Sequence, residues 1–540
     1  MDNPAIADRL EAFAGLLELA GASAYSARAY RRAAELIRAT PAPVAELVRD
    51  GRARELRGVG PAIEVRLREL VETGTLRDLE ELEREVSPEL VGLARYLGVS
   101  PQRMTAIGRE LDVRTLDELR AAADEGRLRS VAGVGPETER KLREALAGGP
   151  PARPGPRLLL NRARALLEGI AAALGGEIAG DVRRWVDAPQ QLAVVVPAEK
   201  GMVRRFSDLP QIVALVEWED TWAAGVTVDG IPVRLVLAGA PAAGTELLRA
   251  TGSAAYVGAL EPLPEAETEE EVYRRLGVPI CPPELREAPF RGEPPPLVEL
   301  SDLRGDLHCH TTWSDGRASV EEMGRAAAER GYEYLAICDH TRSVRVVPGL
   351  DADDLRRQGE EIAEANERLA PFRLLRGSEV DILPDGRLDL PDDVLDELDW
   401  VTASLHAGQR RPREELTRQV VEAMRHPAVR ALSHPTGRLI GYRQPNALDL
   451  ERVLEVALET GLALEVNGLP DRLDLKGEHV RLCVEAGVPI VVNTDAHSLA
   501  GLSNIELALH TARRGWATSA DVVNTRPLSE LLALRAGSAA

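Results

Sequence analysis

Histidine and carboxylate residues recur in short clusters along the C-terminal part of the chain, most of them directly after a short apolar run. All nine histidines lie at or beyond position 308. Imidazole and carboxylate groups without thiolates suit zinc, manganese or iron, and nine ligands suffice for two or three divalent ions. The predicted ligands are His308, His310, Asp315, His340, Glu379, His406, His434, Asp495 and His497.

The apolar runs before these clusters predict the strands that position them. Helical patterns over 320–330 and 355–369 alternate with the runs, so the sequence predicts parallel strands around a barrel-like core. The C-terminal ends of the strands form the active face in such folds, and the clusters fall there. The runs cover residues 334–337, 372–375, 400–403, 429–432 and 488–492.

Some histidines and cysteines of the chain are not expected to bind a metal. His426, His479 and His510 fall in helical or loop contexts and are interpreted as ordinary residues. Cys309 lies between His308 and His310, and in an extended segment its side chain points away from theirs. The four cysteines are irregularly spaced and predict no disulfide framework.

Length, charge and hydropathy limit the class of protein. A chain of 540 residues is long enough for three or four domains, each with its own core. A formal net charge of −21 argues against wholesale coating of nucleic acid, although it says nothing of local patches. The start of the chain has no signal-peptide pattern, and no apolar run approaches about 18 residues. We therefore expect a soluble cytoplasmic protein that does not contact membranes.

Residues 301–525, with their order of ligands, resemble the PHP (polymerase and histidinol phosphatase) family of metal-dependent phosphoesterases. The resemblance implies a distorted (β/α)7 barrel. It also implies that Glu379 bridges two ions. The implied sets are His308, His310, Glu379 and Asp495 for the first ion, Glu379, His406 and His434 for the second, and Asp315, His340 and His497 for the third.

The same resemblance implies the chemistry. Clustered divalent ions lower the pKa of a bridging water and clamp the oxygens of a phosphodiester during in-line attack. Glu379, Asp495 and His497 are then catalytic through a metal-bound hydroxide. Arg438 and Arg443 lie just beyond His434, where forked donors could contact phosphate; a surface ion pair is the alternative interpretation.

Two glycine turns near the N-terminus predict helix-hairpin-helix motifs. Each reads hydrophobic-x-Gly-x-Gly and leads into a helical pattern; the glycines are Gly58 and Gly60 in one turn and Gly133 and Gly135 in the other. Such turns let backbone N–H groups approach a DNA phosphate without reading sequence. Acidic and basic residues nearly balance over 1–150, so we expect modest, salt-dependent affinity for DNA.

The N-terminal part of the chain resembles the first domains of the family X DNA polymerases, carried by the stretch Arg28-Ala29-Tyr30-Arg31-Arg32-Ala33. Members with deoxyribose-phosphate lyase activity use a lysine here as a Schiff-base nucleophile. The first lysine of this chain is Lys141, so no lyase activity is predicted.

The segment that starts at Gly180 resembles the Gly-Ser-x-Arg-Arg turn that opens the polymerase palm. By spacing, the three aspartates that hold two magnesium ions in the active family become Gln191, Ala193 and Arg234. Amide, methyl and guanidinium groups cannot replace carboxylates at a two-cation site. Polymerase activity is therefore predicted to be absent, unless the nearby Asp187 and Asp229 serve in their place.

The predicted fold is multidomain: an all-α helix-hairpin-helix region, an α+β palm-like middle and the PHP barrel. The segment 293–296 is a Pro-rich tether. The predicted domains are an N-terminal helical domain (1–80), a fingers-like helical domain (81–147), a degenerate palm (157–240), a thumb-like domain (241–292) and the PHP domain (301–540).

The leading hypothesis is a DNA-repair-associated metal-dependent phosphoesterase that removes nucleotides or phosphate from DNA 3′ ends. It would contact gapped or 3′-ended DNA through the DNA backbone, and the sequence leaves its protein partners open. Three alternatives remain. They are an active gap-filling polymerase with an exonuclease, a small-molecule phosphatase of the histidinol-phosphatase type, and a DNA-binding scaffold with a structural metal cluster.

Overall fold

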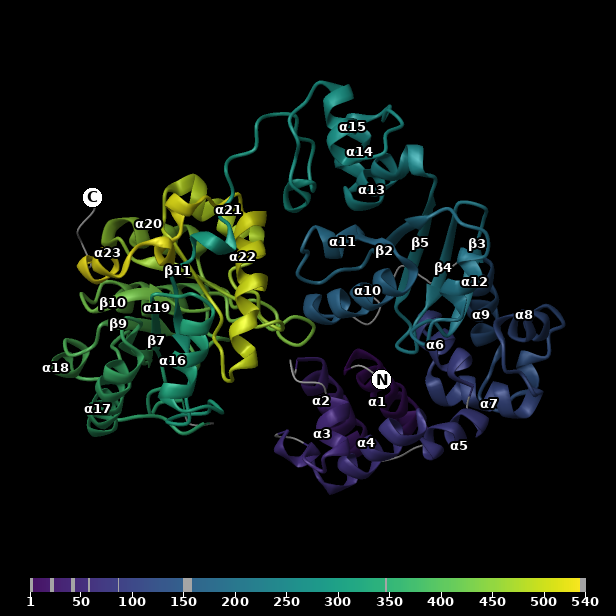
Figure 1. Ribbon diagram of the computed structural model, residues 1–540, viewed down its shortest axis with the longest axis horizontal. Helices are drawn as coiled ribbons and strands as arrows, with labels where there is room; N and C mark the ends of the chain where they lie inside the picture. The colour runs from purple at the N-terminus through teal and green to yellow at the C-terminus, as the bar shows by residue number, and fades with distance from the viewer. Residues whose placement is uncertain are drawn as a thin grey trace. The chain divides into compact units, whose positions relative to one another are not determined.

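The computed structural model describes two compact units (Figure 1). The N-terminal unit comprises residues 1–158, 162–183 and 189–277, and the C-terminal unit comprises 159–161, 184–188 and 278–540. The finer division into five domains stays a prediction. The residues that the structure describes are 3–19, 24–39, 44–56, 59–85, 87–148, 158–344 and 347–534.

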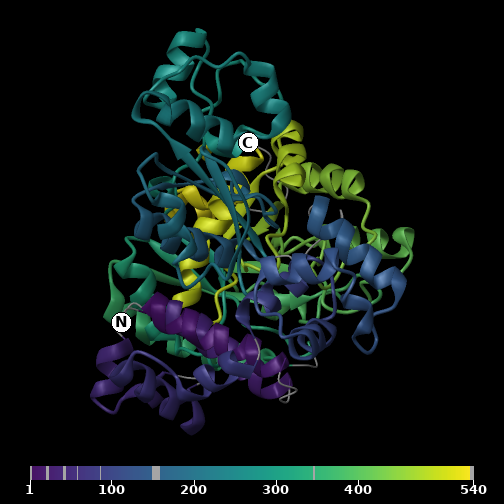
Figure 2. The ribbon, with the colours of Figure 1, turned by 90° about the vertical axis from the view of Figure 1, so that its right-hand side faces the viewer.

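The N-terminal unit begins with helices, in agreement with the predicted all-α region. In α1 and α2, purple in Figure 2, the apolar positions Ile6, Leu10, Phe13 and Ile37 are buried in one core, and the rings of Phe13 and Tyr30 meet edge to face at 4.9 Å. The helices are α1 (Asn3–Leu19), α2 (Ala24–Ala39), α3 (Val44–Arg49), α4 (Pro61–Thr73) and α5 (Arg77–Glu85).

A second helical cluster follows, and its helix starts are fixed by side-chain caps. The hydroxyls of Ser87, Ser100 and Thr115 accept hydrogen bonds from backbone N–H groups of the first turns that follow them. The helices are α6 (Pro88–Tyr96), α7 (Pro101–Leu111), α8 (Leu116–Asp124) and α9 (Pro136–Gly148).

The middle of the chain forms a five-stranded mixed sheet with the order β1-β2-β5-β4-β3. In this sheet β2 and β5 run parallel, and the other neighbouring strands are antiparallel. The strands are β1 (Glu177–Ala179), β2 (Leu192–Pro197), β3 (Ala214–Trp218), β4 (Trp222–Val226) and β5 (Pro232–Ala238). The helices of this region are α10 (Leu160–Leu174), α11 (Gly180–Arg183), α12 (Met202–Ser207), α13 (Ala243–Thr251), α14 (Ala254–Leu260) and α15 (Glu269–Leu276).

The C-terminal unit is a nearly closed barrel of seven parallel strands in the order β12-β11-β10-β9-β8-β7-β6. A parallel bridge between Cys309 and Ala496 brings the two edges together. The strands are β6 (Gly305–Cys309), β7 (Tyr334–Ile337), β8 (Arg373–Asp381), β9 (Trp400–Ser404), β10 (Val429–Leu432), β11 (Ala463–Asn467) and β12 (Ile490–Asn493). The predicted barrel is confirmed, and β6 and β11 add to the five predicted strands.

Helices separate successive strands of the barrel, since each parallel crossover needs a long connection. They pack their apolar faces, such as Val320, Ile362 and Val453, on the strands. The helices are α16 (Val320–Glu329), α17 (Ala352–Leu369), α18 (Asp392–Leu395), α19 (Arg413–Met424), α20 (Leu450–Thr460), α21 (Gly477–Ala486), α22 (Ile505–Arg514) and α23 (Leu528–Ala533). Within the described part of the chain, every helix is too short or too polar to cross a membrane.

Candidate metal centre

The predicted ligands gather at one end of the barrel, the end at which the strands finish. His308 lies in β6 and Glu379 in β8, while His340, His406 and His434 lie one to three residues beyond β7, β9 and β10. Asp495 and His497 follow β12. Parallel strands in a barrel share one C-terminal face, so residues almost 190 positions apart in sequence become neighbours. Three groups within the cluster bring potential ligand atoms within 4.8 Å of one another: His308, His310 and Asp495; His340, Glu379 and His406; and His310, Asp315, His340 and His497.

The fully buried carboxylate of Glu379 lies at the centre of the cluster. Its Oε1 atom is 2.9 Å from His434 Nε2 and 3.4 Å from His406 Nε2. Its Oε2 atom is 2.8 Å from His340 Nδ1 and 3.6 Å from His308 Nε2. One carboxylate therefore faces two sets of imidazoles with different oxygens, which is the arrangement that a bridging ligand requires.

Three nitrogen and oxygen atoms converge beside Glu379 on the β6 side. His310 Nε2 lies 3.0 Å from Asp495 Oδ1 and 3.2 Å from His308 Nε2. All three side chains are almost completely buried. Two imidazole nitrogens and one carboxylate oxygen that face one another at this spacing match the donor set of a divalent transition-metal ion.

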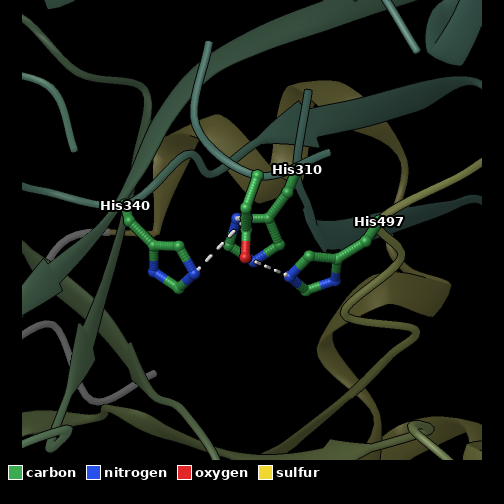
Figure 3. Close-up of side chains that lie close together, drawn as sticks. His310, His340 and His497 are labelled. Carbon is green, nitrogen blue, oxygen red and sulfur yellow. Dashed lines mark ion pairs between the residues drawn. The ribbon is translucent and has the colours of Figure 1, made fainter. Parts of the chain in front are cut away.

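A more open group lies at the edge of the cluster. The rings of His340 and His497 stand on either side of His310, with ring centroids 4.4 Å and 4.2 Å from it (Figure 3). Asp315 joins them: its Oδ2 is 3.3 Å from His497 Nε2 and its Oδ1 is 3.6 Å from His340 Nε2. Asp315 and His497 are half-buried, so this group is the part of the cluster that solvent reaches.

These groups overlap with the implied ligand sets but do not coincide with them. His310 and His340 each belong to two groups, and His434 belongs to none, although it approaches Glu379. The assignment of individual ligands to individual ions stays a prediction. Cys309 is buried, and its Sγ donates to the carbonyl of Ala336 at 3.3 Å.

The electrostatics of the site keep its buried carboxylates ionised but act on its histidines in opposite directions. Against their burial, neighbouring carboxylates raise the pKa values of His308, His340 and His497, the last to about 9. Burial would raise the pKa of Glu379, but the charges of His406, His340 and His308 outweigh it and hold the pKa well below the ordinary value. The pKa of Asp495 is lowered in the same way, against its burial, chiefly by His308 and His310. Burial, aided by His497 and His340, lowers the pKa of His310 to about 3. The carboxylates are therefore ionised and His310 is neutral.

Several buried polar atoms in the cluster have no hydrogen-bond partner among the described residues. They include His310 Nδ1, His434 Nδ1 and Glu379 Oε2, whose close approach to His340 Nδ1 is not aligned for a hydrogen bond. Buried polar atoms without partners are costly, and bound ions would satisfy them. The donor set and its unpartnered atoms thus fit divalent metal ions.

Two ligands of the cluster also have unusual backbone conformations. His434 has φ 25° and Asp495 has φ 53°, in a region that side-chain-bearing residues rarely adopt. Such strain costs on the order of 1–3 kcal/mol and is typical of positions where a side chain must be aimed at a functional site.

A second layer of carboxylates holds the ligands, and the sequence analysis did not identify it. Glu465 in β11 is completely buried and accepts from His308 Nδ1 at 2.7 Å, from Asn493 and Asn467, and from the backbone N–H of His434. Asp381 lies 2.9 Å from His406 Nδ1. Such partners fix the imidazole tautomer so that the other ring nitrogen faces the metal. The available signal was an acidic residue inside the apolar run 463–467.

The predicted DNA-contact glycines are placed in part. Gly58 lies outside the described residues. Gly60 is the N-cap of α4, and Gly135 directly precedes α9. Gly133 has a φ angle of 84°, which favours glycine. A Cβ atom at any of these three glycines would meet nothing within 4 Å, so the turns are open to a large ligand. Their contact with phosphate stays a prediction.

The two predicted phosphate-binding arginines differ in their contacts. Arg438 is buried, and its guanidinium donates to Asp187 at 2.5 Å and to the carbonyl of Leu473. Arg443 is exposed, and only its Nε has a partner among the described residues, the carbonyl of Gly437 at 2.8 Å. Arg443 is therefore the freer of the two.

The three residues predicted at the polymerase aspartate positions lie near one another in the middle sheet, while their correspondence with those aspartates stays a prediction. Ala193 in β2 pairs in register with Arg234 in β5, and Gln191 directly precedes β2. The Arg234 guanidinium lies 4.8 Å from the centre of the Trp222 ring. Asp229 lies in the turn before β5, where it pairs with Arg95 at 2.9 Å. Among the described residues, groups of metal-ligating side chains occur only in the C-terminal unit.

Comparison with known proteins places these features in a family. The chain is 32% identical to the DNA polymerase/3′-5′ exonuclease PolX of Bacillus subtilis over 563 aligned positions, which cover 97% of each protein. The chain belongs to the family X polymerases with a C-terminal PHP domain. Family models agree: residues 1–76 match a helix-hairpin-helix domain, 92–147 a SAM-like helix-hairpin-helix tandem and 306–468 a PHP domain.

The PHP part also resembles smaller proteins. It is 30% identical to a probable phosphatase of Thermoanaerobacter sp. over 232 residues, which are 41% of this chain and 89% of that protein. A probable phosphatase of Acetivibrio thermocellus is 33% identical over 202 residues, 36% of this chain and 78% of that protein. The protein is thus an enzyme with a PHP phosphoesterase domain, and the metal cluster lies in that domain.

Proposed function

We propose that this protein is a metal-dependent 3′–5′ exonuclease or 3′-end phosphoesterase of DNA repair, which acts in the cytoplasm. The observation that carries the proposal is the gathering of the nine predicted histidine and carboxylate ligands, with Glu379 at their centre, at the mouth of the PHP barrel. The similarity to the Bacillus subtilis enzyme over almost the whole chain supports DNA as the substrate, as do the helix-hairpin-helix matches.

Two or three divalent ions held by these residues would supply Lewis acidity and an activated water for hydrolysis of a phosphodiester. The residues have distinct tasks in this proposal. Glu379 would be a ligand at the centre of the cluster, and His308, His310 and Asp495 would form its deepest group. Glu465 and Asp381 orient His308 and His406 through their Nδ1 atoms. Asp315 and His497, which are half-buried, form the side from which substrate enters.

We further propose that the palm no longer transfers nucleotides. Nucleotidyl transfer needs two cations held by carboxylates, and by their spacing in the sequence Gln191, Ala193 and Arg234 take the positions of the family's three aspartates. The two nearby aspartates are engaged elsewhere, Asp187 with Arg438 and Asp229 with Arg95. The palm and the helical region would then serve to hold DNA for the PHP domain.

One experiment separates these functions. The purified protein is incubated with 5′-labelled gapped DNA, manganese and all four deoxynucleotides, beside the Asp495→Ala variant. We expect shortening from the 3′ end by the wild-type protein alone. Extension of the primer would refute the loss of polymerase activity, and an unchanged length would refute the exonuclease.

Hydrolysis of small phosphate monoesters is a second candidate activity. It is favoured by the similarity of the PHP part to proteins described as probable phosphatases, since that part covers 89% and 78% of the two compared above. A metal-dependent release of phosphate from histidinol phosphate, with DNA of unchanged length, would support it over the exonuclease.

A further inference from the structure

Three neighbouring loops form the rim of the metal site on the side of His406 and His434. They follow β9, β10 and β11, which are adjacent in the barrel. The backbone N–H of Ile440 donates to the carbonyl of Asp471 at 2.7 Å and ties the second loop to the third. The side chain of Gln409 packs against Gly437 and ties the first loop to the second.

The middle loop presents an aromatic side chain to solvent. Residues 439–443 form a tight turn in which Leu439 and Arg443 bridge and Gly441 has φ 83°, a conformation that favours glycine. Ile440 is buried and anchors the turn. Tyr442 points away from the protein and is 88% exposed, the largest exposure of any large apolar side chain among the described residues. It therefore contributes almost nothing to the fold.

Arginines without acidic partners lie on the same three loops. Arg410, Arg443 and Arg472 come one from each loop, and none of them has a carboxylate within ion-pair distance in the described part of the chain. The contacts between the loops hold the three arginines on one rim. Burial and the charges of Arg472 and Arg410 accordingly lower the pKa of Arg443, against Asp474 and Asp471. Unpaired cations in a protein of net charge −21 mark a site for an anion.

We propose that Arg410, Tyr442, Arg443 and Arg472 form a rim that holds the single-stranded 3′ end of DNA beside the metal centre. Tyr442 stacks on a base, and the arginines contact successive backbone phosphates. Base stacking on an exposed aromatic, combined with cations along the backbone, is the usual means of binding single strands without reading their sequence. This inference rests on the proposed exonuclease and adds the form of DNA that it accepts.

The first test compares two substrates with the full-length protein and manganese: a 5′-labelled single-stranded oligonucleotide and bis(p-nitrophenyl) phosphate. Tyr442→Ala should lower the ratio of DNA hydrolysis to small-ester hydrolysis by about fivefold to 100-fold, because the small ester has no base to stack on Tyr442. Tyr442→Phe should retain the ratio. Trp218→Ala, which removes a 56% exposed aromatic from β3 in the N-terminal unit, is the matched control and should also retain it.

The second test identifies the stacking partner on the DNA. An abasic position is moved through the last few nucleotides of the oligonucleotide. At one position it should slow the wild-type protein about as much as Tyr442→Ala does, and it should slow the Tyr442→Ala variant no further. If the abasic position slowed the Tyr442→Ala variant as much as the wild-type protein at every position, stacking by Tyr442 would be refuted.

The outcomes separate this inference from the proposed function. If the wild-type protein hydrolyses the small ester but leaves DNA intact, the exonuclease is refuted and the rim with it. If the wild-type protein degrades DNA and Tyr442→Ala has the wild-type ratio, only the rim is refuted. The triple change of Arg410, Arg443 and Arg472 to Ala should reduce the slope of log affinity against log salt by about 0.7 for each phosphate that the variant no longer neutralises. An unchanged slope would refute binding of phosphates by these arginines.

Discussion

The palm and the PHP barrel bring side chains together in the same way and differ in what they bring. In the palm, parallel strands β2 and β5 set Ala193 opposite Arg234, with Gln191 just before β2. In the barrel, parallel strands converge on Glu379 with histidines and carboxylates. Among the described residues, only the barrel groups side chains that could hold metal ions. Function therefore has to be argued from the side chains at each site and not from the scaffold alone.

The largest expected effect is loss of hydrolysis when the barrel loses a ligand. Asp495→Ala should reduce the rate of 3′-end removal by roughly 10³-fold or more, because stabilisation of charge by the bound ions is lost. Gel analysis of end-labelled DNA measures it, and metal analysis of the purified variant should show fewer ions. His426→Ala removes a histidine outside the cluster and should keep both the rate of 3′-end removal and the metal content. Wild-type activity of the Asp495→Ala variant would show that the cluster in the barrel does not catalyse the hydrolysis.

Metal binding should stabilise one unit only. At a free manganese concentration 100 times the dissociation constant, the C-terminal unit should gain about 2.7 kcal/mol of unfolding free energy, since the ligand binds only the folded state. Hydrogen exchange should slow in peptides from β6 to β12 and remain unchanged in peptides from β1 to β5. Protection of the palm by manganese would mean that it still holds an ion.

A smaller effect is expected from the second layer of the barrel site. Glu465→Gln keeps the size of the side chain but removes the charge that orients His308, so metal affinity should fall by roughly 10- to 100-fold. Titration of the metal-free protein with manganese measures this directly. Glu478→Gln changes an exposed glutamate of α21 in the same unit and should leave the affinity unchanged. Equal manganese affinities of the wild-type protein, Glu465→Gln and Glu478→Gln would show that Glu465 does not position a ligand.

The smallest effect is expected in the palm. Arg234→Ala should leave DNA hydrolysis unchanged and lower the stability of the N-terminal unit by about 0.5–1 kcal/mol, because the guanidinium no longer packs on the Trp222 ring. Denaturant unfolding and the exonuclease assay together measure the two effects. A strong loss of hydrolysis would mean that the palm takes part in catalysis after all.

The sequence alone determined the barrel and the candidate ligands, because apolar runs alternate with helices and each polar cluster follows a strand. The prediction that Gln191, Ala193 and Arg234 occupy the polymerase aspartate positions also comes from the sequence, since the interval between turn and strand is a local property. Both predictions rest on short-range patterns, namely hydrophobic periodicity and the spacing of residues.

Only the tertiary structure decided which side chains meet. Glu465 lies in a strand that the sequence analysis did not predict, and its contact with His308 spans 157 positions. The pairing of Arg438 with Asp187 spans 251 positions, whereas Arg443 in the same loop remains free of carboxylates. Tyr442 showed no signal in the sequence, because its exposure depends on the fold of a turn anchored by Ile440. Contacts across the mouth of a barrel depend on the closure of the whole sheet, and no local pattern records them.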